Sequence, residues 1–278
     1  MPVPQLPPEL TDRIILAVDR GTLPACALVC SSWLPASRYA MFRFVHIRSS
    51  VSYELLVSRV LSSESMKHHL PDVRKMVLWN RKEGDFPEDR IPESWPSFFQ
   101  LFAAHLPNLT TVVLGTTNWD QRPTHPLTSL VLSRFISVRH LELRGCNFPS
   151  FGTLRRALSA LPSLDFLIVE GGSWPVPSAE LSPLLLGNGA YGSARPRLST
   201  LHLYTHPGPL NRLRTHQLVT WLSTTATPTT LHKLQFMEHL PLEVGCRGLL
   251  DSFGPSFPLF MRNISALGFS LIASDEGD

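Results

Sequence analysis

Residues 138–147 read Val138-Arg-His-Leu141-Glu-Leu143-Arg-Gly-Cys146-Asn147, and the apolar pattern of this stretch returns along the chain. The pattern is an apolar residue, two variable residues, an apolar residue, one variable residue and a third apolar residue. Further copies begin at Val73, Leu109, Leu164, Leu198, Leu231 and, more weakly, Ile264. Successive copies lie 36, 29, 26, 34, 33 and 33 residues apart. A repeat of this length predicts a solenoid, in which each coil buries its apolar side chains against its neighbours.

The repeated phrase resembles the leucine-rich repeat, because Cys146 and Asn147 stand where such repeats place a cysteine or asparagine after the strand. The resemblance implies an α/β solenoid with short parallel strands on its concave face and helices on its convex face. Apolar stretches at 95–102, 154–158 and 217–222 would supply those helices. The spacing exceeds the roughly 20–29 residues of regular repeats. We therefore expect about seven long, divergent repeats over residues 49–278.

A second apolar pattern occupies residues 1–48. Leu6, Leu10 and Ile14 recur at helical spacing, and the prolines before Glu9 suit the start of a helix. Gly21 is expected to end this helix and Pro24 to open a second one. So short a segment cannot bury so many apolar side chains by itself, which predicts that they pack against something larger.

The segment from Leu6-Pro7-Pro8-Glu9-Leu10 to Val29-Cys30-Ser31-Ser32-Trp33 resembles an F-box, in the form common in mushroom-type (basidiomycete) fungi. This resemblance implies docking onto the Skp-type adaptor of a Skp–cullin–F-box ubiquitin ligase, and through it onto a cullin. The turn at 19–22 is shorter and less acidic than in many relatives. The alternative is a helical hairpin that only caps the following domain. The residues expected to bind the Skp-type adaptor are Leu6, Pro7, Leu10, Ile14, Leu28, Val29 and Trp33.

The outward-facing residues of the predicted strands form a second candidate surface. In each phrase the third and fifth residues, and the residue that directly follows the phrase, would point away from the core on the concave face. Large apolar groups among charges at such solvent-facing positions are typical of a protein-binding surface. Ordinary strand propensity favours the same residue types and is the alternative explanation. The candidate substrate-binding residues are Trp79, His140, Glu142, Arg144, Phe166, Ile168, Tyr204, Lys233 and Met237.

Composition limits the class of protein. The net charge of +3 is spread along the chain without a run of Lys or Arg, so we expect no nucleic-acid surface. We expect no secretory signal and no membrane segment, because no apolar run is long enough. The four cysteines are then read as reduced thiols. These observations predict a cytoplasmic or nuclear protein with no membrane partner.

No motif indicates chemistry within the chain. Residues 187–192 match the glycine pattern of dinucleotide sites, but Pro183 and Pro196 leave no strand and helix around them. Cys26 and Cys30 lack a second pair of zinc ligands, and the eleven histidines form no metal-binding spacing. We therefore expect no enzymatic activity, no catalytic residue, no cofactor and no metal.

Together these patterns predict a substrate-recruiting adaptor of a ubiquitin ligase, with an F-box at 1–48 and repeats that bind a protein substrate whose identity the sequence does not reveal. A scaffold protein that acts without ubiquitin transfer remains the alternative. Two interpretations of the end of the repeats stay open. The last repeat is incomplete, or the acidic residues 275–278 form part of a cap.

Overall fold

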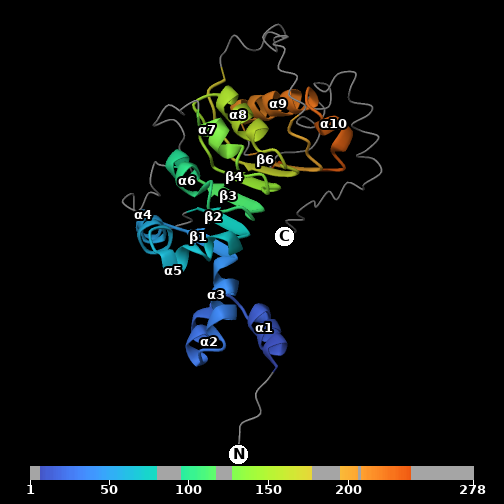
Figure 1. Ribbon diagram of the computed structural model, residues 1–278. Helices are drawn as coiled ribbons and strands as arrows, with labels where there is room; N and C mark the ends of the chain where they lie inside the picture. Colours follow the sequence, from blue (N-terminus) through green and yellow to red (C-terminus); the bar gives the residue numbers. More distant parts are fainter. Residues whose placement is uncertain (1–6, 80–94, 117–126, 177–194, 206–207, 239–278) are drawn as a thin grey trace, which may run out of the picture.

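The computed structural model describes residues 7–79, 95–116, 127–176, 195–205 and 208–238, and a parallel sheet of seven strands runs through them (Figure 1). The order of the strands in the sheet is their order in the chain, and every neighbouring pair is parallel. The predicted α/β class with parallel strands is therefore confirmed. The strands are β1 (Phe44–Ile47), β2 (Lys75–Leu78), β3 (Thr111–Gly115), β4 (His140–Arg144), β5 (Phe166–Glu170), β6 (Thr200–Thr205) and β7 (Lys233–Glu238).

Each of the six described copies of the phrase forms one strand, and the copies pair position for position. Leu141 lies beside Val112 on one side and beside Leu167 on the other. This register stacks the apolar second and third anchors of the phrases on one face of the sheet, where those of β2 to β6 are buried and Leu234 of β7 is partly buried. The weak copy that begins at Ile264 lies outside the described residues.

Strand β1 has no copy of the phrase, and it was not predicted. It pairs with β2 from Phe44↔Lys75 to Ile47↔Leu78, so it belongs to the sheet by its hydrogen bonds although it falls inside the predicted segment 1–48. Only Ile47 of β1 is fully buried in the core. Its sequence, Phe-Val-His-Ile, does not follow the leucine pattern by which the other strands are recognised.

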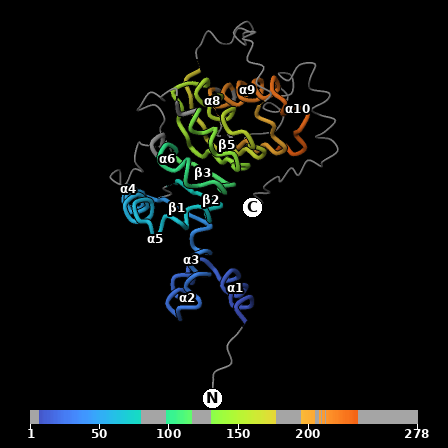
Figure 2. The backbone as a smooth tube through the Cα atoms, in the orientation of Figure 1, coloured from blue at the N-terminus to red at the C-terminus, as the bar shows by residue number. Residues whose placement is uncertain are grey.

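Helices line one side of the sheet, and the tube view shows the same arrangement (Figures 1 and 2). Phe98, Phe102, Phe135 and Phe148 fill the layer between them and the strands. The predicted helical stretches at 95–102, 154–158 and 217–222 all lie in helices of this layer. The elements after β1 are α4 (Ser50–Leu55), the π-helical turn η1 (Leu56–Leu61), α5 (Glu64–Lys67), the 3-10 turn η2 (Leu70–Asp72), α6 (Trp95–Phe102), α7 (Leu127–Leu132), α8 (Phe151–Ala160), α9 (Pro209–Ser223) and α10 (Thr227–Thr230).

Three short helices stand below the β1 end of the sheet: α1 (Pro8–Ala17), α2 (Leu23–Val29) and α3 (Leu34–Phe42) (Figure 1). The first helix ends at Ala17, earlier than the predicted end at Gly21, because the backbone of Val18 is already extended. Helix α3 leads directly into β1. Arg20, in the turn between α1 and α2, donates a hydrogen bond from Nη2 to the carbonyl oxygen of Phe44 at 2.6 Å. The three helices are thus tied to the first strand at two points.

Candidate functional site

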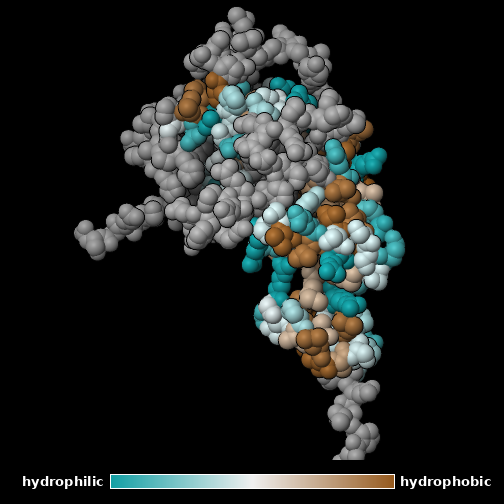
Figure 3. Space-filling model, turned by 90° about the vertical axis from the view of Figure 1, so that its left-hand side faces the viewer, coloured by the Kyte–Doolittle hydropathy of each residue, from teal (hydrophilic) through white to brown (hydrophobic). Residues whose placement is uncertain are grey.

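The first candidate surface lies on α1 and α2. Leu28 is 86% exposed, Val29 62%, Leu10 45% and Ile14 42%, and Leu16, on another side of α1, is also exposed. Apolar side chains gather on this lower, helical part of the molecule in the space-filling view (Figure 3). Four of the predicted adaptor-binding residues are therefore exposed apolar side chains of these two helices. We call them the helical patch and define it as Leu10, Ile14, Leu28 and Val29.

The helices have two apolar stripes each, and only one of them is buried. In α1, Thr11 and Ile15 are one turn apart and face inward, while Leu10 and Ile14 form the neighbouring stripe. In α2, Leu23 and Cys26 face inward and leave Leu28 and Val29 outside. Of the other predicted residues, Pro7 is exposed, Trp33 is partly buried and Leu6 lies outside the described residues. Leu16 was not predicted, although it belongs to the same apolar segment.

The second candidate surface is the face of the sheet opposite the helices, and within the described residues no helix covers it. Its middle row was expected to face solvent, and this prediction is wrong. Glu142 is 7% exposed and Ile168 is 8% exposed, and His202 is also buried. The middle row lies between two rows of larger side chains, such as Phe166 and Tyr204, on strands only about 4.8 Å apart. In the flanking rows Trp79, His140, Arg144, Phe166 and Tyr204 remain partly exposed, whereas Thr200 is buried.

Aromatic rings cross this face from strand to strand. The ring of Phe166 lies 4.1 Å from that of His140 on β4 and 4.9 Å from that of His202 on β6. Tyr204 follows at 6.4 Å from His202. The register brings these residues together, because the outward positions of β4, β5 and β6 stand side by side. Burial, with the nearby charge of Lys233, lowers the pKa of His202, which favours its neutral form at pH 7.

A charged cluster sits beside the rings. Arg144 donates hydrogen bonds from Nε and Nη2 to Glu142 Oε2 at 3.1 and 2.7 Å, and its Nη1 lies 3.3 Å from Glu170 Oε2. His140 Nε2 lies 3.3 Å from Glu142 Oε1. The imidazole of His140 first, and then Arg144, lower the pKa of Glu142 to about 2 against the effect of burial. The carboxylate therefore keeps its charge although water barely reaches it.

The cluster extends to Trp79, after the end of β2. The Arg144 guanidinium lies 5.1 Å from the centroid of the Trp79 ring. The Trp79 ring in turn rests against the backbone of Gly115, where a Cβ atom would clash with its Cδ1 and Cγ atoms. Gly115 is thus the residue that allows Trp79 to lie flat beside the cluster. Lys233 is exposed at the start of β7, and the side chain of Met237 lies outside the described part.

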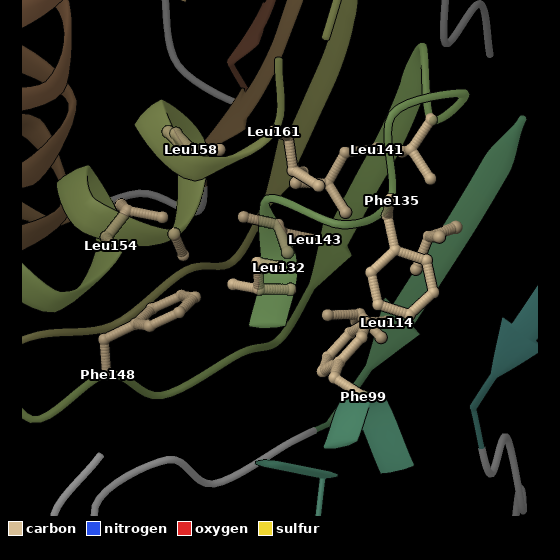
Figure 4. Close-up of a pocket in the computed structure, with 13 residues that line it drawn as sticks. Phe99, Leu114, Leu132, Phe135, Leu141, Leu143, Phe148, Leu154, Leu158 and Leu161 are labelled. Carbon is tan, nitrogen blue, oxygen red and sulfur yellow. The ribbon is translucent and has the colours of Figure 1, made fainter. Parts of the chain in front are cut away.

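A small cavity in the core offers no chemistry. A cavity of about 20 Å³ lies between the sheet and helices α6 to α8, and all its thirteen lining residues are apolar (Figure 4). A water molecule needs polar partners to occupy such a space, so this cavity is a packing gap of the core. Among the described residues no three His, Cys, Asp or Glu side chains could hold a metal ion together. The glycine motif at 187–192 lies outside the residues that the structure describes.

The three described cysteines differ in their exposure. Cys26 and Cys146 are buried and Cys30 is exposed. The Cys146 thiol donates a hydrogen bond to the carbonyl oxygen of Leu114 in the preceding coil, at 3.4 Å. A hydrogen bond with Ser32 lowers the pKa of Cys30.

In the parts of the chain that the structure describes, no helix combines the length and the apolar character needed to cross a membrane. Comparison with models of known protein families finds no match, and no curated protein matches the chain.

Proposed function

We propose that the chain is a substrate-recruiting adaptor of a Skp–cullin–F-box ubiquitin ligase. In this proposal residues up to about Phe42 form an F-box that binds a Skp-type adaptor, and the coils after them form a divergent leucine-rich-repeat solenoid that binds a protein substrate. The mechanism is proximity, since the chain would hold its substrate near the conjugating enzyme of the ligase.

The observation that carries the proposal is the helical patch. Leu28 and Val29 sit on a helix of seven residues with most of their surface in water. Burial of a leucine or valine contributes about 1.5–3 kcal/mol, so an exposed group of this kind is a strong site for a partner. The patch falls on the residues that match the F-box pattern, which supports a Skp-type adaptor as that partner.

The coil geometry supports the second half of the proposal. Each phrase contributes one strand, the strands follow in chain order, and the helices lie together on one side. Cys146 occupies the position after β4 and bonds to the backbone of the coil before it. Such a contact from coil to coil is what a cysteine or asparagine at this position of a leucine-rich repeat would supply.

Co-purification with a recombinant Skp-type adaptor tests the first half. The double variant Leu10→Ala with Leu28→Ala is expected to weaken binding at least about tenfold, with little change in stability because both side chains are exposed. The matched control is Leu130→Ala with Ile136→Ala, two exposed apolar residues of the helical layer, which should bind like the wild type. Equal binding by the wild type and the first double variant would overturn the proposal.

The scaffold alternative shares the adaptor-binding step with the ligase and differs only in the absence of ubiquitin transfer. A cullin that co-purifies with the wild type and is lost with the Leu10→Ala and Leu28→Ala variant supports the ligase. Adaptor binding without any cullin, and without ubiquitin transfer to co-purified proteins, would favour the scaffold instead.

A further inference from the structure

The residues just before the strands form one continuous line along the edge where all strands begin. The carbonyl oxygen of each except the last, His232, accepts hydrogen bonds from two successive N–H groups of the next coil. Arg139 O, for example, accepts from Asp165 N at 2.9 Å and from Phe166 N at 2.8 Å. We call this line, together with the first residue of every strand, the rim. The line consists of Arg43, Arg74, Thr110, Arg139, Asp165, Ser199 and His232.

The rim is rich in positive charge. Its one carboxylate is Asp165, and its cations, histidines aside, are Arg43, Arg74, Lys75, Arg139 and Lys233. Arg20 adds a further cation at the β1 end, because its guanidinium lies 4.1 Å from the centroid of the Phe44 ring. Among the described residues no carboxylate lies within ion-pair distance of these cations, since the ion pairs there join other residues. Their charges are available to an anionic partner.

The cations are distributed along the whole rim, with an apolar ring between them. Lys75 begins β2 and Lys233 begins β7, five strand spacings apart, or about 24 Å. An extended peptide covers that distance with about seven residues. Phe166, partly exposed at the start of β5, offers apolar contact between Arg139 and Lys233.

We propose that the rim binds an acidic peptide segment of the recruited protein, extended across the strands from β2 to β7. Its carboxylates pair with Lys75, Arg139 and Lys233, and an apolar side chain of the segment packs against Phe166. The inference rests on the proposed function for the statement that the segment belongs to a recruited protein. The charge complementarity itself is a property of the rim.

A protein segment fits the face better than a nucleic acid does. Glu142 lies two residues beyond the rim on the same face, and Asp165 interrupts the rim itself. An unbroken chain of phosphates would be repelled at these carboxylates. A peptide can place uncharged residues there, because its charges are not bound to a fixed spacing.

Fluorescence anisotropy on the full chain tests the proposal, with a labelled peptide of about eight alternating glutamate and leucine residues as the probe. We expect the double variant Arg139→Gln with Lys233→Gln to weaken binding about tenfold, and added salt to weaken binding to the wild type. The control, Arg59→Gln with Arg156→Gln, removes the same charge from exposed positions on η1 and α8 and should bind like the wild type. No binding by the wild type, or equal weakening by both double variants, would overturn the inference.

Two further arms identify the occupant. A single-stranded oligonucleotide that competes better than the peptide would assign the rim to nucleic acid and overturn the proposal. The chain's own acidic end is a second rival. Tighter peptide binding by the variant Asp275→Asn, Glu276→Gln, Asp278→Asn would show that this end occupies the rim, and would overturn the assignment to a recruited protein.

Skp-type adaptor binding by the rim variant Arg139→Gln with Lys233→Gln is measured in parallel. If the wild type binds the Skp-type adaptor but not the peptide, only the proposed peptide binding by the rim is refuted. The converse result, peptide binding without adaptor binding, refutes only the proposed ligase function.

Discussion

Glu142 carries a charge on a part of the sheet from which water is nearly excluded, and its neighbours keep that charge in place. Its pKa is lowered to about 2 from the ordinary value of 4.5. A carboxyl group whose pKa is lower in the folded than in the unfolded state stabilises the fold at pH values above its pKa in the unfolded chain. That contribution is lost as the pH falls from about 4.5 towards 2.

The variant Glu142→Gln is therefore expected to lower the free energy of unfolding at pH 7 by about 1–2 kcal/mol, allowing for solvent screening. The difference from the wild type should shrink as the pH falls below about 4.5. Denaturant titrations of the wild type and the variant at several pH values across this range measure the difference. Glu64→Gln is the control, because the Glu64–Lys67 pair lies on the surface and contributes about 0.5 kcal/mol or less. A difference that stays constant with pH would contradict the role given to the His140–Glu142–Arg144 cluster.

Gly115 is the second residue with a consequence of its own. A Cβ atom at this position would displace the Trp79 ring, so Gly115→Ala is expected to cost about 1–3 kcal/mol of unfolding free energy. The same substitution at Gly152, in the first turn of α8, meets only ordinary contacts and should be neutral or stabilising by about 0.5–1 kcal/mol. The denaturant midpoints of the two variants, each compared with that of the wild type, measure these effects. Equal effects at both positions would show that Trp79 moves aside without cost.

At the scale of elements, the strands were predictable and the boundaries of the helical segment were not. The phrase marks each strand because its second and third apolar anchors are two residues apart and point to the same, helix-covered face. The residues between them point to the other face, which no described helix covers. In β4, for instance, Leu141 and Leu143 are buried where the pattern requires it. Strand β1 escaped prediction because Phe44 and His46 alternate with Val45 and Ile47 without any leucine anchor.

The helices α1 and α2 show a different limit of sequence reasoning. Both stripes of α1 contain apolar side chains, so periodicity alone cannot tell which one packs against α3. The structure buries Ile15 and exposes Ile14, its direct neighbour. The candidate residues were thus predicted as a set, but their exposure depends on tertiary contacts. The same holds for Ile168, whose burial depends on side chains from other coils.

At the scale of the whole molecule, Arg20 is a second connection between the helices that carry the patch and the sheet, beside the direct run of α3 into β1. Its side chain joins the turn between α1 and α2 to the backbone and the ring of Phe44. Arg20→Ala is expected to cost only about 0.5–1.5 kcal/mol of stability, because one hydrogen bond and one cation–π contact are lost. It should nevertheless widen the range of distances between the helices and the sheet.

Spin labels on Cys30 and on a cysteine introduced at the exposed Ser163 measure this distance, in a background with Cys246→Ser. Cys26 and Cys146 are buried and should not react. Arg13→Ala, which removes an exposed arginine of α1, is the control. An unchanged distance distribution in Arg20→Ala would mean that the direct connection from α3 into β1 is sufficient to orient the patch.

The agreement between strand order and chain order has a consequence for biosynthesis. Every strand pairs with the one that precedes it in the chain, so its partner has always left the ribosome earlier. Each nascent coil can add to a finished edge without waiting for distant residues, in contrast to sheets whose central strands are made last. The chain can therefore fold as it is translated, from β1 towards β7. Its newest strand is then the edge of the described sheet to which the next strand adds.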